Sequence, residues 1–115
     1  GGDQDPVVYA DCVKPSIQPE SITIACGDGN IVKSKITWDS WGDAEAGGSG
    51  TAEVDLCDPN CADGTIGKYI SGVTVSDLKD CNGEQAYLAI EIDFMDEAPK
   101  GFDDPYKTSL GCGEK

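Results

Sequence analysis

Histidine and arginine are both missing from this 115-residue chain. Without histidine the chain lacks the commonest general base and metal ligand, so neither a Ser–His–Asp triad nor a Cys–His pair can form within it. Without arginine it lacks the planar group that binds phosphates and carboxylates in a bidentate manner. Long apolar runs are also missing, and we expect no membrane-spanning segment, because such a helix needs about 20 apolar residues.

Positive charge is scarce: eight lysines stand against 22 acidic residues, which gives a net charge of −14. A chain this acidic repels nucleic acids and anionic lipids, and we exclude both as partners. Solubility in a salty or calcium-rich exterior explains the charge more simply than a specific cationic ligand does. Because so many acids produce chance pairs, two neighbouring carboxylates alone do not indicate a glycan hydrolase. We predict a protein that is not an enzyme and that uses no cofactor.

The chain length fits one domain. We expect a flexible segment over residues 1–11, with Gly1–Gly2 as the remnant of a tag, followed by a single β domain over residues 12–115. Short runs of alternating apolar and polar residues, separated by Gly, Pro, Asn and Asp, predict strands. The predicted strands are Ile22–Cys26, Ile31–Asp39, Thr51–Cys57, Ile66–Leu78, Tyr87–Phe94 and Tyr106–Cys112. This pattern favours an antiparallel, immunoglobulin-like β-sandwich stapled by disulfides, with a small β-barrel as the alternative.

The alternation also predicts which side chains face the core. In the second strand it places Trp38 inward with Ile36, and Lys33 outward. Leu56 is expected to face inward and Leu88, Ile90, Ile92 and Phe94 to line the core. We expect a flexible loop over Gly42–Gly50, and a bulge at Gly72 in the long Ile66–Leu78 strand.

Six cysteines in a short acidic chain indicate a disulfide framework formed in an oxidising compartment. A zinc knuckle is the rival interpretation, but no CxxC pair and no histidine accompany these cysteines. A local bridge between Cys57 and Cys61, across a tight turn, is our first prediction. The simplest pairing of the others joins Cys12 to Cys26 and Cys81 to Cys112.

Six short blocks stand out in the sequence: SITIACGDGN (21–30), ITWDSWG (36–42), GT (50–51), CDPNCADG (57–64), VTV (73–75) and LGC (110–112). In this order they resemble a group of small secreted or lipid-anchored actinobacterial proteins. The resemblance implies an extracytoplasmic location, with a possible lipid anchor outside the sequence given, and it implies no catalytic residues. The chain departs from the group at Ile70–Gly72, where a Tyr-Pro-Val stretch is typical, and it is far more acidic.

Trp41 is the most conspicuous candidate for a binding residue. It follows a strand and precedes a Gly-rich loop, and Asp39, Asp43 and Glu45 lie beside it in the sequence. An exposed indole is a platform for a sugar ring or an anchor for an apolar partner. We nevertheless favour the simpler interpretation that both tryptophans cap the core.

Two Asp/Asn turns are weaker candidates for calcium sites. One contains Asp58, Asn60 and Asp63, and the other pairs Asp28 with Asn30. Carboxylates and turn carbonyls suit calcium, but neither turn has EF-hand spacing, and Asx-turns explain the same residues without a metal.

Our preferred function is an extracytoplasmic binding module for an extracellular protein or an envelope glycan, displayed at the cell envelope or secreted. An inhibitor of a secreted enzyme is the alternative, with Asp58, Pro59 and Asn60 as its inhibitory loop, because a clamped loop loses little entropy on binding. A glycan hydrolase that uses carboxylates is the third possibility.

Overall fold

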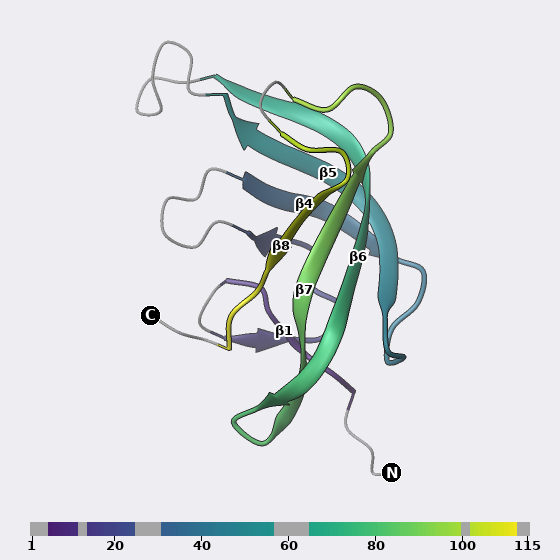
Figure 1. Ribbon diagram of the computed structural model, residues 1–115, viewed down its shortest axis with the longest axis vertical. Helices are drawn as coiled ribbons and strands as arrows, with labels where there is room; N and C mark the ends of the chain where they lie inside the picture. Colours follow the sequence, from purple (N-terminus) through teal and green to yellow (C-terminus); the bar gives the residue numbers. More distant parts are fainter. Residues whose placement is uncertain (1–4, 12–13, 25–30, 57–64, 100–101, 113–115) are drawn as a thin grey trace.

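The computed structural model describes residues 5–11, 14–24, 31–56, 65–99 and 102–112 (Figure 1). The described residues form strands and turns and contain no helix, which confirms the all-β class. The alternating sequence pattern forms strands because it buries one face of a sheet and exposes the other. The strands are β1 (Val8–Tyr9), β2 (Pro15–Ser16), β3 (Ile22–Thr23), β4 (Ile31–Trp38), β5 (Ala46–Asp55), β6 (Ile66–Cys81), β7 (Glu84–Phe94) and β8 (Tyr106–Ser109).

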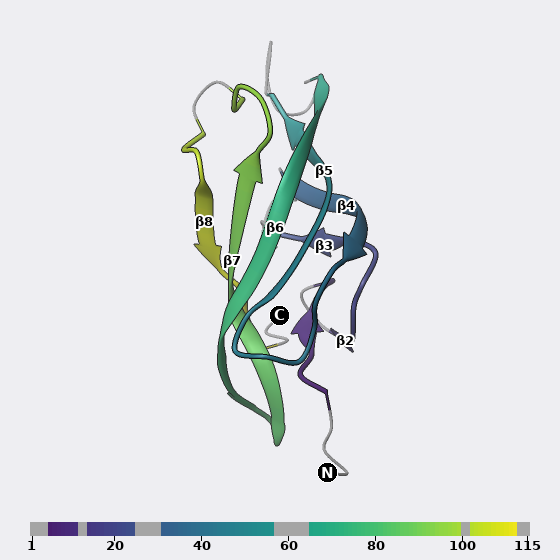
Figure 2. The ribbon, with the colours of Figure 1, turned by 90° about the vertical axis from the view of Figure 1, so that its right-hand side faces the viewer.

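Strands β3 to β8 form one antiparallel sheet in which the spatial order follows the sequence order. The sheet curls into a half-barrel, and the long β6–β7 hairpin runs along its height (Figures 1 and 2). The predicted antiparallel, disulfide-stapled β fold is therefore confirmed. Immunoglobulin sandwiches connect two sheets by Greek-key crossovers, so this curled meander is closer to the barrel alternative.

The N-terminal segment connects the two sides of this half-barrel at one end. Val7 exchanges backbone hydrogen bonds of 2.9 and 3.0 Å with Gln85 and Tyr87, and the Ala10 carbonyl accepts one of 2.7 Å from Thr23. Strand β1 also pairs with β2 to form a short ribbon. The residues from Val7 to Ala10 are buried, which differs from the flexible segment that we expected, because their apolar side chains complete the core at this end.

The main core lies on the inner face of the half-barrel. Ile90, Ile92 and Phe94 are buried there as the alternation predicts, whereas Leu88 is half-buried. A second, smaller cluster of Val7, Tyr9, Cys81 and Ala86 joins the N-terminal segment to the β6–β7 hairpin. Apart from three alanines, the main cluster consists of Val8, Ile22, Ile24, Ile31, Ile36, Val54, Val73, Val75, Tyr87, Ile90, Ile92, Phe94 and Leu110.

Strand β5 starts at Ala46, inside the stretch that we predicted to be a loop. Gly50 is required by a bulge in β4, where the register shifts between Ser34 and Thr37 and Lys35 has a φ of 53°. A Cβ atom at Gly50 would lie 2.6 Å from the Ser34 carbonyl oxygen and 3.0 Å from that of Lys35. The Gly-rich composition therefore marks a close approach of two backbones and not a flexible loop.

Two smaller predictions about strands were also wrong. Gly72 pairs in continuous register with Ser49 and Asp93, so the predicted bulge in β6 does not form. Leu56 lies beyond the end of β5 and is exposed, because the alternation that would have turned it inward ends with the strand.

A disulfide joins Cys81, at the end of β6, to Cys112, which follows β8. This pairing agrees with the prediction, and the Cα atoms are 5.6 Å apart, within the usual range for a disulfide. In the part of the chain that the structure describes, no helix is long and apolar enough to cross a membrane.

Candidate functional site

The turn between β4 and β5, residues 39–45, contains the predicted binding residues. Trp41 is half-buried, and its ring lies edge-on to Trp38 at 4.8 Å and to Tyr87 at 5.2 Å between centroids. These separations and angles are typical of favourable aromatic pairs. Both tryptophans pack against the main core, which agrees with the capping role that we favoured for them.

The N–H groups of both indoles form hydrogen bonds within the protein. Trp38 Nε1 donates to the Pro19 carbonyl at 2.8 Å, and Trp41 Nε1 donates to the Pro6 carbonyl at 2.9 Å. These bonds attach the turn to the N-terminal segment and to the residues that precede β3. The half-buried ring with its occupied N–H leaves only the exposed part of Trp41 accessible.

The start of the turn is held by its own backbone. The amides of Asp39 and Ser40 both donate to the Gly47 carbonyl, at 2.8 and 3.2 Å. The Ser40 hydroxyl in return accepts a hydrogen bond of 3.1 Å from the Gly47 amide. Ser40 therefore pins the first residues of the turn to the first residues of β5.

Tyr87 holds the middle of the turn from beneath. Its hydroxyl donates to the Asp43 carbonyl at 2.6 Å and accepts from the Gly42 amide at 3.1 Å. Gly42 has a φ of 103°, a conformation that favours glycine. Burial raises the pKa of Tyr87, and the negative charges of Asp43 and Asp5 act in the same direction against the opposing Gly42 hydrogen bond. The hydroxyl therefore stays protonated and can keep donating at neutral pH.

The side chains of Asp39, Asp43 and Glu45 are exposed on this fixed turn. Neither of the ion pairs between described residues, Lys79–Asp77 and Lys107–Glu91, involves them. The predicted residues thus lie on one turn, whose backbone is hydrogen-bonded to β5 and Tyr87 at Asp39, Ser40, Gly42 and Asp43.

Lys33 is a buried charged residue that the alternating pattern wrongly predicted to face outward. The bulge at Lys35 inserts one residue, so Ile31 and Lys33 face inward before it, and Ile36 faces inward after it. The sequence holds a signal for this, because buried positions five residues apart cannot share one face of a regular strand. Lys33 is consequently fully buried although it carries an amine.

The Lys33 amine lies against β6. Its Nζ donates to the Ser71 carbonyl at 2.7 Å and also contacts the Ser71 hydroxyl. Desolvation lowers the pKa of Lys33 to about 8. A lysine of lowered pKa beside a serine is used as a base in Ser–Lys hydrolases. Here Ser71 is 0% exposed, so no substrate reaches its hydroxyl, and the contact is structural in this conformation.

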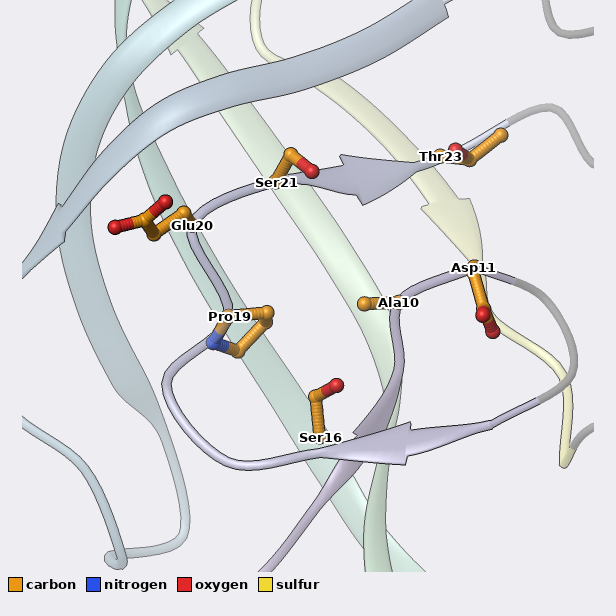
Figure 3. A pocket seen from close by; sticks show the side chains of 7 residues that line it. All are labelled: Ala10, Asp11, Ser16, Pro19, Glu20, Ser21 and Thr23. Atoms are coloured by element: carbon orange, nitrogen blue, oxygen red, sulfur yellow. The ribbon is translucent and has the colours of Figure 1, made fainter.

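A shallow pocket of about 340 Å³ lies between the β1–β2 ribbon and β3. Two carboxylates, those of Asp11 and Glu20, are among its lining residues. Figure 3 shows them at opposite sides of the pocket, with the Glu20 side chain directed away from Ala10 and Ser16. Asp11 also accepts a hydrogen bond of 2.6 Å from the Lys14 amide. The two carboxylates therefore do not converge on a common point as a pair of acid and base residues would.

Several predicted sites lie outside the described residues. They include the Cys57–Cys61 and Cys12–Cys26 bridges, the inhibitory loop, and both candidate calcium turns. The described residues contain no cluster of three or more His, Cys, Asp or Glu side chains placed to hold a metal ion. The predicted site residues that lie outside the described part of the chain are Cys12, Cys26, Asp28, Asn30, Cys57, Asp58, Pro59, Asn60, Cys61 and Asp63.

No known protein family, curated protein or solved structure matches this chain.

Proposed function

We propose that this protein is an extracytoplasmic binding module that uses the β4–β5 turn to hold a positively charged partner and performs no chemistry of its own. The observation that carries the proposal is the anchoring of the turn. Tyr87 and Ser40 fix its backbone, and Asp39, Asp43 and Glu45 project from it. A loop that is ordered before binding loses little conformational entropy when the partner arrives.

Electrostatics favour a cationic partner, which is either a basic extracellular protein or an envelope glycan that carries amines. The net charge of −14 accelerates the encounter with a cation, and three nearby carboxylates supply complementary contacts. The Cys81–Cys112 disulfide is compatible with an oxidising, extracytoplasmic compartment.

A paired-column capture experiment tests this proposal. The oxidised protein is immobilised, extracts of the host envelope and culture fluid are passed over it, and retained molecules are identified by mass spectrometry. A second column carries the variant D39N/D43N/E45Q. A third carries D80N/E84Q/D103N, which removes the same charge elsewhere on the surface.

The proposal expects a cationic molecule that the native protein and the third column retain and the turn variant loses. If both variant columns lost the molecule equally, net charge alone would explain its retention, and the turn would not be the binding site. A secreted hydrolase that all three columns retain, and that the native protein inhibits, would favour the inhibitor alternative.

A further inference from the structure

A second exposed feature lies on the outer face of the sheet, away from the β4–β5 turn. Ile66, Ile70 and Met95 form what we call the outer apolar patch, and they are 52%, 64% and 69% exposed. Isolated exposed apolar residues are common on protein surfaces and need no explanation. Contiguous ones are unusual and mark interaction surfaces.

The sheet register shows that the patch is contiguous at its centre. The Met95 amide donates to the Ile70 carbonyl at 3.0 Å, and Phe94 pairs with Ser71, so Ile70 and Met95 are directly opposite each other. Directly paired residues project from the same face with Cβ atoms about 5 Å apart. Thr51 occupies the same position on the other side of Ile70.

The patch continues along β6. Ile66 lies on the same face as Ile70, with Lys68 between them, and all three are exposed. The aliphatic part of a lysine side chain covers apolar neighbours while its amine stays in water. From Ile66 to Ile70 this face of β6 is open to solvent, and the main core lies on the other side of the sheet.

Carboxylates surround the patch. Glu53 pairs with Lys68, Asp93 pairs with Gly72, which follows the patch along β6, and Asp96 and Glu97 follow Met95. One lysine therefore stands among four acids. An apolar centre with an acidic rim complements a surface in which apolar side chains are bordered by lysine or arginine.

We propose that the outer apolar patch docks a protein segment that carries apolar side chains flanked by basic residues. This inference does not depend on the function proposed for the turn. A second copy of this chain fits poorly, because a symmetric contact would bring the acidic rims and two net charges of −14 together. An anionic membrane is repelled in the same way.

A titration with a synthetic amphipathic peptide of leucine and lysine tests the proposal, using fluorescence anisotropy of a labelled peptide. The variant I70T/M95T removes the centre of the patch while keeping residues that suit a strand or its end. I17T is the control, since Ile17 is 50% exposed but lies apart from the patch in the β2–β3 connection. Unchanged near-ultraviolet circular dichroism shows that each variant remains folded.

We expect I70T/M95T to weaken peptide binding by about tenfold and I17T to leave it unchanged, and a peptide with glutamate in place of lysine should not bind. Equal binding by both variants would overturn the proposal, since charge alone would then hold the peptide. If the native protein dimerises in sedimentation velocity and I70T/M95T abolishes the dimer, the patch binds a second copy of the chain. That result would overturn the proposal of a basic protein segment. Binding to neutral phosphatidylcholine vesicles that depends on Ile70 and Met95 would overturn it in favour of a lipid surface.

Discussion

Ile70 and Ser71 are consecutive residues of β6, and each is in the environment that would suit the other. Ile70 is 64% exposed on the outer face, where it is paired with Met95, whereas Ser71 is 0% exposed on the inner face, where it binds the Lys33 amine. Sheets normally bury the apolar residue and expose the polar one, and a slip of one residue would restore that arrangement here. The register of β6 is therefore set elsewhere along the strand.

The residues that set this register lie further along β6 and β7. Val73 and Val75 are buried opposite Ile92 and Ile90, and a slip of one residue in β6 would turn both valines to the outer face. Burying a side chain of this size contributes about 1.5–3 kcal/mol, so the two valines together outweigh the exposed Ile70. The comparison shows that a strand tolerates an inverted pair near one end when its middle is strongly specified.

We call Lys33 and Ser71 the inner pair. The largest change in stability is expected at Gly50 of β5, which pairs with Ser71 and lies against the bulge in β4. Gly50 pairs with Ser71, and a Cβ at Gly50 would lie 2.6 Å from the Ser34 carbonyl oxygen. We expect G50A to lower the free energy of unfolding by about 3 kcal/mol, because the bulge backbone must move. Chemical denaturation measures this change.

Gly72 provides a matched control on β6. A Cβ there would be no nearer than 3.8 Å to the Gly48 carbonyl oxygen, so G72A should change the stability by less than about 0.5 kcal/mol. If G50A and G72A changed the free energy of unfolding by similar amounts, the bulge backbone would adjust at little cost. The close approach at Gly50 would then not explain why Lys33 faces inward.

The inner pair itself is the subject of the second prediction. K33M replaces a buried amine by an apolar chain of similar length, and we expect it to stabilise the protein by about 2–3 kcal/mol at pH 7. S71A should cost about 1–3 kcal/mol in the native protein, because the amine loses an acceptor, and almost nothing in K33M. A double-mutant cycle based on urea unfolding measures this coupling.

The pH dependence of the same variant gives an independent check. The pKa of Lys33 is about 8 in the folded protein against 10.5 in the unfolded chain, so unfolding takes up a proton between these values. The Lys33 contribution therefore rises with pH, and its penalty is largest below pH 8 and gone by about pH 10.5. We expect the advantage of K33M over the native protein to shrink across this window. A constant difference would show that folding does not lower the pKa of Lys33, as expected for an amine that is well solvated in the folded protein.

Much of the fold was predictable from the sequence, and the inner pair shows where prediction stopped. Ile90, Ile92 and Phe94 alternate regularly in a strand without interruption, so simple parity identified their buried face. Lys33 was assigned to the wrong face because parity was carried across the bulge at Lys35. A bulge depends on contact with a neighbouring strand, here through Gly50, and a local pattern does not record that contact.

The candidate site was predictable to a similar degree. The alternation placed Trp38 correctly toward the core, and the position of Trp41 at the strand end located the turn. The carbonyl acceptors of the two indoles, at Pro19 and Pro6, were not predictable, because they belong to segments far away in the sequence. For the same reason the burial of Tyr87 beneath the turn was missed, since it requires β7 and the turn to meet.

The smallest effect on stability is expected for the outer pair, Ile70 and Met95. Ile70 and Met95 bury little surface in the free protein, and threonine suits a strand, so I70T/M95T should change the free energy of unfolding by less than about 0.5 kcal/mol. Thermal and urea unfolding measure this, with K33M run beside it. A decrease in the free energy of unfolding of more than about 2 kcal/mol would show that the two side chains stabilise the free protein, as buried side chains do. A negligible change would mean that folding does not require these apolar side chains, which separates their role from that of the inner pair and leaves docking as the property to test.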